Sequence, residues 1–269
     1  MRFIQILILA LMAAPLWAAD LPEDVIARLQ NADVVIVGEV HDNPAHHANQ
    51  HAVLSALQPK AVVWEMLTRD EAGRITSEMI HAPERLATAL EWSQSGWPAF
   101  SMYHQVFLAA PDARIFGGEV PREAALATIQ SGPATVFGAD AERYGLTTHL
   151  PEAQEAAREA LQFAAHCEAV PRERMRAMVD IQRLRDAVLA REVIAAFKET
   201  GGPVAVITGN GHARRDWGIP VYLDRVQPGL NLFVLGQSEA GRIDGAFDAV
   251  LDSEAPARED PCTAFRDDG

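Results

Sequence analysis

The chain has 269 residues, of which 49% are hydrophobic, and this is ample for the core of one large domain. Its 37 acidic residues outnumber its 23 basic ones, which gives a formal net charge of −14 at pH 7. A surface with this balance repels nucleic acid and anionic membranes, so neither is expected as a binding partner.

The first twenty residues, "MRFIQILILALMAAPLWAAD", are typical of a secretory signal peptide. Arg2 is the only charge before a short apolar run, and small residues follow it. The run is too short to span a membrane comfortably, and no Cys lies near it for a lipid anchor. We therefore expect a signal peptide over residues 1–19, cleaved near Ala18 or Ala19. A single domain over residues 20–269 would then lie in the periplasm or be secreted, soluble and without a stable membrane anchor.

The rest of the chain alternates between apolar runs and helical patterns. The runs are rich in β-branched residues and lack strict alternation, which is typical of strands buried on both faces. They cover residues 33–38, 61–66, 113–118, 203–209 and 230–236. Helical patterns cover residues 44–57, 69–81, 152–165 and 171–199, with Asn43 as N-cap and Pro44 in the first turn. This order predicts an α/β fold: a mainly parallel, buried sheet flanked by helices. The mostly helical middle, about 80–165, would form an insertion, lid or subdomain.

Two of the predicted strands are followed by Gly-x-x-His. The first motif contains Glu39 and ends at His41, and the second ends at His212. Glu65 ends the strand between them in sequence. Ligands of open α/β sheets bind beyond the carboxyl ends of the strands, so we expect these four side chains to converge there. Two imidazoles and two carboxylates are suitable ligands for a divalent metal ion.

Further polar residues lie beside these motifs. Four of the nine His fall between residues 41 and 51, and of these His46 and His47 are candidates to face the site from the next helix. Arg185 and Asp186, in the middle of the long helical pattern, would orient the ligands, although a solvated helix face is an alternative explanation. Arg214 follows the second motif in "GNGHARRD".

The segments "VVIVGEVHDNPAHHANQ", "VVWEM", "QRLRDAVLA" and "GNGHARRDWGIPVYL" together resemble the ChaN-like haem-binding family. That family is grouped with the Tiki, TraB and erythromycin-esterase proteins, and the resemblance spans roughly residues 30–235. It implies an α/β fold and a role in haem or iron acquisition, with homodimers that hold two stacked haems. For the wider superfamily it implies metal-dependent hydrolysis, here by His41, His212, Glu39 and Glu65.

Two functions from different classes therefore compete. Haem binding is favoured, and the stretch "WSQSGWPAFSMYHQVF", residues 92–107, would supply an apolar wall with Trp97 and the iron ligand. Tyr103 is the first choice of ligand; the same stretch also carries His104, and the other two tyrosines, Tyr144 and Tyr222, remain open as ligands. Ordinary core packing of this stretch is the alternative. The other function is a metal-dependent hydrolase with Glu39 or Glu65 as general base. Covalent attachment of a c-type haem is excluded because no Cys-x-x-Cys-His occurs.

The chain has two Cys, Cys167 and Cys262. An even count in an exported protein predicts one disulfide bond, which would fix the polar C-terminal tail to the helical region around Cys167. Two free thiols are the alternative.

Overall fold

The structure is a computed structural model that describes residues 21–260, 262 and 263. The predicted signal peptide, residues 1–19, lies outside the described residues. Within the described part of the chain, no helix is long and apolar enough to cross a membrane.

The centre of the molecule is a six-stranded sheet in which every neighbouring pair of strands is parallel. The strand order is β3-β2-β4-β1-β5-β6. The predicted α/β fold with a parallel, helix-flanked sheet is therefore confirmed, and each of the five predicted runs contains a strand. The strands are β1 (Val34–Val37), β2 (Ala61–Trp64), β3 (Arg114–Gly117), β4 (Val204–Ile207), β5 (Leu232–Glu239) and β6 (Ala249–Ser253).

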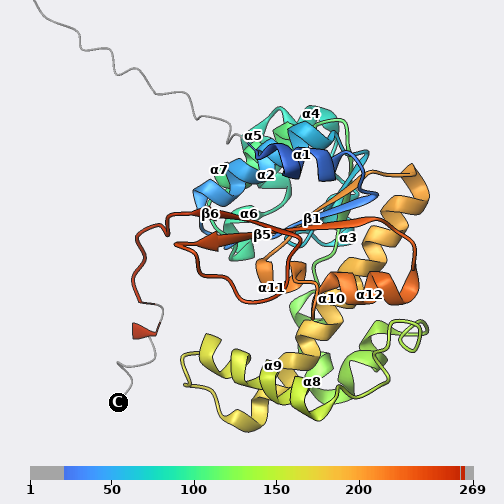
Figure 1. Cartoon of the computed structure of the whole chain (residues 1–269), viewed down its shortest axis with the longest axis vertical. Coiled ribbons are helices and arrows are strands. Elements are labelled where there is room, and N and C mark those ends of the chain that lie inside the picture. The colour runs from blue at the N-terminus through green and yellow to red at the C-terminus, as the bar shows by residue number, and fades with distance from the viewer. Residues whose placement is uncertain (1–20, 261, 264–269) are drawn as a thin grey trace, which may run out of the picture.

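Side chains of the central strands alternate between two hydrophobic cores. On β1, Val35 and Val37 face one core, whereas Val34 and Ile36 face the other. Because both faces are covered by helices, every residue of this strand is buried, which explains its continuous apolar sequence. The helices that pack on the first of these cores, most of them above the sheet in Figure 1, are α1 (Glu23–Leu29), α2 (Pro44–Leu57), α4 (Ser77–Ile80), α5 (Pro83–Ala89), α6 (Trp92–Ser95) and α7 (Phe100–Ala109).

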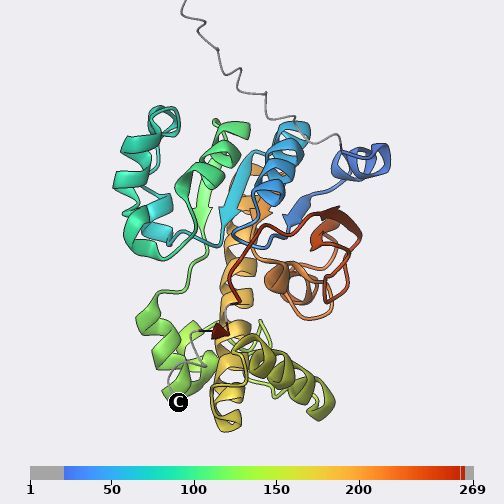
Figure 2. The same cartoon turned by 90° about the vertical axis from the view of Figure 1, so that its left-hand side faces the viewer.

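The opposite face is covered by α10 (Met175–Thr200) and α12 (Ile219–Val226), with the short α11 (Asn210–Ala213) between β4 and α12. The first half of α10 extends beyond the sheet and packs against α8 (Arg122–Phe137) and α9 (Glu152–Ala165) (Figures 1 and 2). We call these three elements the helical lobe. The middle section, residues 80–165, thus contributes α5–α7 to the upper layer, β3 to the sheet and α8–α9 to the lobe.

Helix boundaries follow local signals. The Asn43 side chain accepts a hydrogen bond from the Ala45 amide at 2.9 Å, and α2 begins at Pro44 as predicted. The prediction of one helix over residues 69–81 is wrong. The segment forms α3 (Arg69–Ala72) and α4, because α3 ends at Gly73 and the backbone is extended at Thr76.

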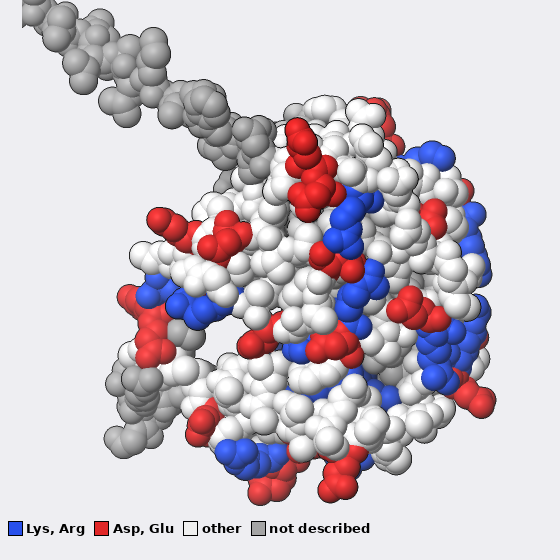
Figure 3. All heavy atoms as spheres, viewed as in Figure 1, with Lys and Arg blue, Asp and Glu red and all other residues white. Residues whose placement is uncertain are grey.

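The predicted Cys167–Cys262 disulfide bond is confirmed, with 5.3 Å between the two Cα atoms. The chain leaves β6 and runs along the side of the molecule toward the helical lobe (Figures 1 and 2). On this path the Arg258 guanidinium pairs with the carboxylates of Asp42 and Glu239, at 2.6 Å each. The space-filling view shows the molecule hollowed between the α/β body and the helical lobe (Figure 3).

Candidate functional site

Three neighbouring strands place polar residues at one edge of the sheet. Glu39 and His41 follow β1, Glu65 follows β2, and His212 lies on α11 after β4. Since β4 lies between β2 and β1, the three strand ends are adjacent. A Cβ atom at Gly209 would lie 3.0 Å from His41 Nε2 and 3.7 Å from a Glu65 carboxylate oxygen. The structure therefore brings the four residues of the two motifs together.

Glu39 is a buried carboxylate surrounded by hydrogen-bond donors. One oxygen accepts bonds from His41 Nδ1 at 2.7 Å and from the Tyr103 hydroxyl at 3.0 Å. The other accepts a bond from the Gln50 amide at 2.5 Å. Its charge is balanced within the protein, and its role here is to fix the orientation of the His41 ring.

His41 is the accessible imidazole of the site, with 34% of its side chain exposed. Its ring meets that of Trp97 edge-on, with 4.9 Å between the centroids. Burial lowers the His41 pKa, but the hydrogen bond to Glu39 and the nearby carboxylates outweigh burial and raise the pKa to about 9. Because Nδ1 is engaged by Glu39, Nε2 is the nitrogen left for a ligand, and a metal ion there must displace the proton that the raised pKa keeps on the ring at neutral pH.

His212 lies between two buried carboxylates. Its Nδ1 is 2.6 Å from Asp186, and its Nε2 is 3.4 Å from Glu65. Burial acts to lower the His212 pKa, yet the two carboxylates raise it overall. Burial likewise opposes ionisation of Glu65, but His212 and His41 bring the Glu65 pKa below its ordinary value. The three groups form a carboxylate–imidazole–carboxylate row, in which Asp186 orients His212 as the sequence suggests.

The metal site expected from His41, His212, Glu39 and Glu65 is not assembled in this arrangement. Among residues 21–260, 262 and 263, no group of three His, Cys, Asp or Glu side chains is disposed to hold a metal ion. The physical reason is that these side chains are already paired with one another. Glu39 accepts hydrogen bonds at both oxygens, and both His212 nitrogens face carboxylates.

His46 and His47, on α2, support the loop after β1. Both are fully buried. His46 Nδ1 accepts a hydrogen bond from the Val40 amide at 2.9 Å, and His47 Nε2 lies 2.8 Å from the His41 carbonyl oxygen. The expectation that they contact a cofactor does not fit this geometry, because their rings are occupied in holding the His41 loop.

The aromatic stretch of residues 92–107 belongs mainly to the core rather than to an open wall. Trp92, Tyr103 and Phe107 are all buried in the core beside α2 and β2. Of the stretch's three predicted cofactor contacts, Trp97 lies against the partly exposed His41 ring, whereas Tyr103 reaches the site only through its hydroxyl, which donates to the buried Glu39. Burial and the Glu39 charge strongly raise the Tyr103 pKa, which disfavours a phenolate. His104 Nε2 lies 2.8 Å from the Ile80 carbonyl oxygen of α4. Direct iron ligation by Tyr103 or His104 is therefore not supported by this arrangement.

A small pocket of about 70 Å³ opens beside these residues. Its polar lining consists of Glu65, Glu119 and Arg185, and Trp97 forms one side. Arg185 thus lies at the site, as expected from the sequence. Burial, with the negative charge of Glu71, raises the Glu119 pKa to about 7.

Sequence reasoning missed Glu119. A signal for it was present, because the tripeptide Gly-Glu-Val that follows β1 is repeated after β3, at residues 118–120. Both glutamates therefore occupy equivalent places after their strands.

Arg214 lies on the other side of His212. Its guanidinium makes two hydrogen bonds to the Asp216 carboxylate, at 2.7 and 2.6 Å, and stacks over Trp217 at 3.8 Å. It lines a second pocket, together with Asp186. The predicted site residues thus fall into two groups, one at the pocket lined by Glu65 and one at the pocket lined by Arg214, and His212 lies between the two.

Fold and site together define an α/β protein with an all-parallel sheet and His–carboxylate pairs at its carboxyl edge. The chain belongs to the ChaN family of haem-binding uptake proteins in the Tiki superfamily, whose family model matches residues 25–223. Among solved structures it is similar to ChaN of Campylobacter jejuni, described as binding haem cofacially. That match has a TM-score of 0.65 and 20% identity, and covers 82% of this chain and 87% of that one.

A type III effector, HopBA1, is also similar, with a TM-score of 0.49, 11% identity and coverage of 86% of this chain and 91% of that one. A succinoglycan biosynthesis protein has a TM-score of 0.41 and 12% identity, over 81% and 68% of the two chains. These two likenesses carry no functional argument. No curated protein matches the chain.

Proposed function

We propose that this chain binds haem at the carboxyl edge of the sheet and acts in haem and iron acquisition outside the cytoplasm. The observation that carries the proposal is the match to the haem-binding uptake family over residues 25–223, which includes every residue of the His-rich site. The likeness to Campylobacter jejuni ChaN supports the fold on which such a site is built.

The residues around His41 fit an iron porphyrin, and the sequence did not predict His41 as the haem-iron ligand. His41 is partly exposed, and a carboxylate holds its Nδ1, as is common for imidazoles that ligate metals. Gly209 leaves space beside Nε2 that a Cβ would fill. Trp97 offers an aromatic surface next to the ring. We therefore propose His41 as the iron ligand in place of Tyr103; bound haem would supply the iron centre and its planar apolar macrocycle.

The size of the pocket suggests how the macrocycle is accommodated. Sites that enclose a drug-sized ligand are roughly 300–1,000 Å³ in volume. The pocket beside Trp97 measures about 70 Å³, too little to enclose a porphyrin. A haem on His41 would therefore lie across the opening with one face uncovered. A second copy of the chain carrying its own haem would cover that face, so we propose a homodimer with two haems face to face. The Campylobacter jejuni protein is described as binding haem cofacially.

Export supports the same function. The leader-like start of the sequence is typical of secreted proteins, and the Cys167–Cys262 bond suits an oxidising compartment. Haem collected in the periplasm or outside the cell would meet the site there. Intact-mass analysis of the exported protein tests this part, since retention of Met1 would contradict it.

Haemin titration followed at the Soret band tests the binding proposal. We expect the wild-type protein to give a saturable shift, and His41→Ala to bind at least about tenfold more weakly, as the loss of a metal ligand implies. His104→Ala is the matched control, because its imidazole faces α4 and should leave binding unchanged. A wild-type protein without a saturable shift contradicts the proposal.

A second candidate function is metal-dependent hydrolysis. The observation that favours it is the buried row Glu65–His212–Asp186, since an imidazole between two carboxylates is suited to proton transfer. Metal analysis after incubation with Zn²⁺ and dialysis distinguishes the two functions. One retained ion per chain that disappears in His212→Ala would favour the hydrolase, whereas haem binding requires none.

A further inference from the structure

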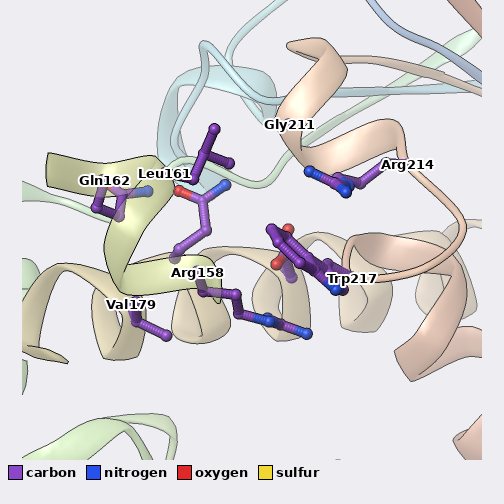
Figure 4. Close-up of a pocket in the computed structure, with 9 residues that line it drawn as sticks. Arg158, Leu161, Gln162, Val179, Gly211, Arg214 and Trp217 are labelled. Atoms are coloured by element: carbon purple, nitrogen blue, oxygen red, sulfur yellow. The ribbon is translucent and has the colours of Figure 1, made fainter. Parts of the chain in front are cut away.

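A second pocket lies on the far side of His212, between the α/β body and the helical lobe (Figure 4). It has a volume of about 70 Å³ and combines polar and apolar walls. The apolar walls are Leu161, Val179 and the Trp217 ring. The polar walls come from α9, α10 and the segment around α11, and include Arg158, Gln182, Asp186 and Arg214.

Arg158 is the unusual residue of this pocket. It is only 7% exposed, yet within the described part of the chain no carboxylate lies within ion-pair distance of it. Its Nη2 donates to the Gln154 amide oxygen at 3.2 Å, and its Nε has no hydrogen-bond partner. A buried guanidinium stays charged, so a site that leaves it unpaired lowers the stability of the protein. Such an arrangement is expected where an anion from outside completes the pairing.

The neighbouring arginines each have a carboxylate partner. Arg214 makes two hydrogen bonds to Asp216. Arg183 does not line the pocket; its Nε also has no hydrogen-bond partner among the described residues, but its guanidinium lies 3.4 Å from Asp180 and donates to the carbonyl oxygens of residues 145 and 148. The pocket also faces one carboxylate, Asp186, which opposes an incoming anion, but that group is engaged by His212 at 2.6 Å. Arg158 is therefore the cation of the pocket that still lacks an anionic partner.

Trp217 defines the shape of the ligand. The guanidinium groups of Arg158 and Arg214 both lie over its ring, at 5.1 and 3.8 Å from the centroid (Figure 4). The ring therefore forms an aromatic wall directly beside the unpaired charge. A group that is anionic at one end and flat or apolar behind it matches both features.

We propose that this pocket binds the carboxylate end of an organic ligand, with Arg158 as its ion-pair partner and Trp217 as its apolar wall. The apolar lining favours a carboxylate on a carbon skeleton, and a planar carboxylate can accept two hydrogen bonds from one guanidinium. Two sources share this chemistry. One is a propionate arm of haem, in which case the inference rests on the proposed function; the other is a free small carboxylate.

Calorimetric titration with benzoate and with its neutral analogue benzamide tests the pocket without haem. We expect benzoate to bind at least about tenfold more tightly than benzamide, as the loss of a charge-assisted hydrogen bond implies. Arg158→Gln should remove this preference. Arg174→Gln is the matched control, because Arg174 is exposed immediately before α10.

Arg158→Lys covers the case in which Arg158→Gln does not fold. It keeps the charge and loses the planar fork, so it should bind benzoate with an intermediate affinity. Removal of an unpaired buried charge should also leave the melting temperature of Arg158→Gln at or above the wild-type value. A purely structural arginine would instead lower it.

Haemin and haemin dimethyl ester identify the source of the carboxylate. If Arg158→Gln weakens haemin binding but leaves the ester unaffected, the ligand group is a haem propionate. If benzoate depends on Arg158 and haemin does not, it is a free carboxylate. Equal binding of benzoate and benzamide, no benzoate binding, or unchanged benzoate binding in Arg158→Gln would each overturn the inference. Failure of the wild type to bind haemin would contradict the proposed function alone, because the benzoate titration still tests the pocket.

Discussion

Gly209→Ala is a direct steric probe of the space beside His41. The backbone at Gly209 has φ −63° and ψ 151°, a conformation that any residue adopts, so the substitution introduces no backbone strain. The added methyl group would lie 3.0 Å from His41 Nε2 and 3.2 Å from Cε1. Non-bonded carbon contacts are normally about 3.5–4.0 Å, so the imidazole has to move by several tenths of an ångström.

The size of the effect follows from what holds the ring. His41 Nδ1 is bound to Glu39 at 2.7 Å, and Trp97 lies against the ring edge. Moving the imidazole against these contacts costs about 1–2 kcal/mol, the range of mild overpacking. If the free energy of haemin binding falls by the same 1–2 kcal/mol, the affinity falls roughly five- to thirtyfold, since about 1.4 kcal/mol corresponds to a factor of ten. The melting temperature should fall by about 2–8 °C.

The assay is a haemin titration at the Soret band, with thermal unfolding followed by circular dichroism on the same samples. Gly73→Ala is the control. That glycine has φ −67° and ψ −15°, and a Cβ there would meet only the carbonyl oxygens of Arg69 and Asp70, at 3.4 and 3.7 Å. A folded Gly209→Ala protein with wild-type haemin affinity would refute the reasoning that the space beside Nε2 is where the iron lies.

Three further predictions concern stability. The raised His41 pKa stabilises the fold, fully so below pH 6.5, and this contribution is lost as the pH rises through about 9. After allowance for the exposed third of the side chain, the contribution amounts to about 1–2 kcal/mol. It is measurable as a loss of stability against urea between pH 6 and pH 10, and His41→Ala should abolish that loss. Above its raised pKa of about 7, the ionised Glu119 carboxylate lowers the stability of the fold. Glu119→Gln should therefore raise the melting temperature at pH 8 and leave it nearly unchanged at pH 4. An equal change at both pH values would argue against this. The Cys167–Cys262 bond spans 95 residues, so replacing both Cys by Ser should lower the free energy of unfolding by about 4 kcal/mol. A loss below about 1 kcal/mol would show that other contacts hold the C-terminal segment.

The sequence predicted the sheet because its central strands are buried on both faces and therefore carry continuous β-branched runs. It also located both Gly-x-x-His motifs, since a motif at the end of a parallel strand always lies at the carboxyl edge. It missed β6, an edge strand whose residues are not fully buried and which ends in Asp252 and Ser253.

The aromatic stretch shows where sequence reasoning fails. Its aromatic residues are chemically alike. Only packing therefore decides that Tyr103 is buried, with its hydroxyl on Glu39, whereas Trp97 lies against the partly exposed His41 ring. Arg158 is a second case. It lies in an Ala-rich helix whose pattern predicts a solvated arginine, and it becomes buried because the helical lobe folds against Trp217.

The visible spectrum of the ferric haem complex, compared among wild type, His41→Ala and Tyr103→Phe, tests the central claim most directly. If haem lies on His41, the wild-type protein binds haemin with a saturable Soret shift. Tyr103→Phe keeps the same spectrum, because the Tyr103 hydroxyl donates to Glu39 and lies 3.5 Å from the His41 carbonyl oxygen rather than at the iron. His41→Ala should lose the ligand signature and bind at least about tenfold more weakly. A wild-type spectrum with phenolate charge-transfer features that disappear in Tyr103→Phe, with His41→Ala unchanged, would contradict the account.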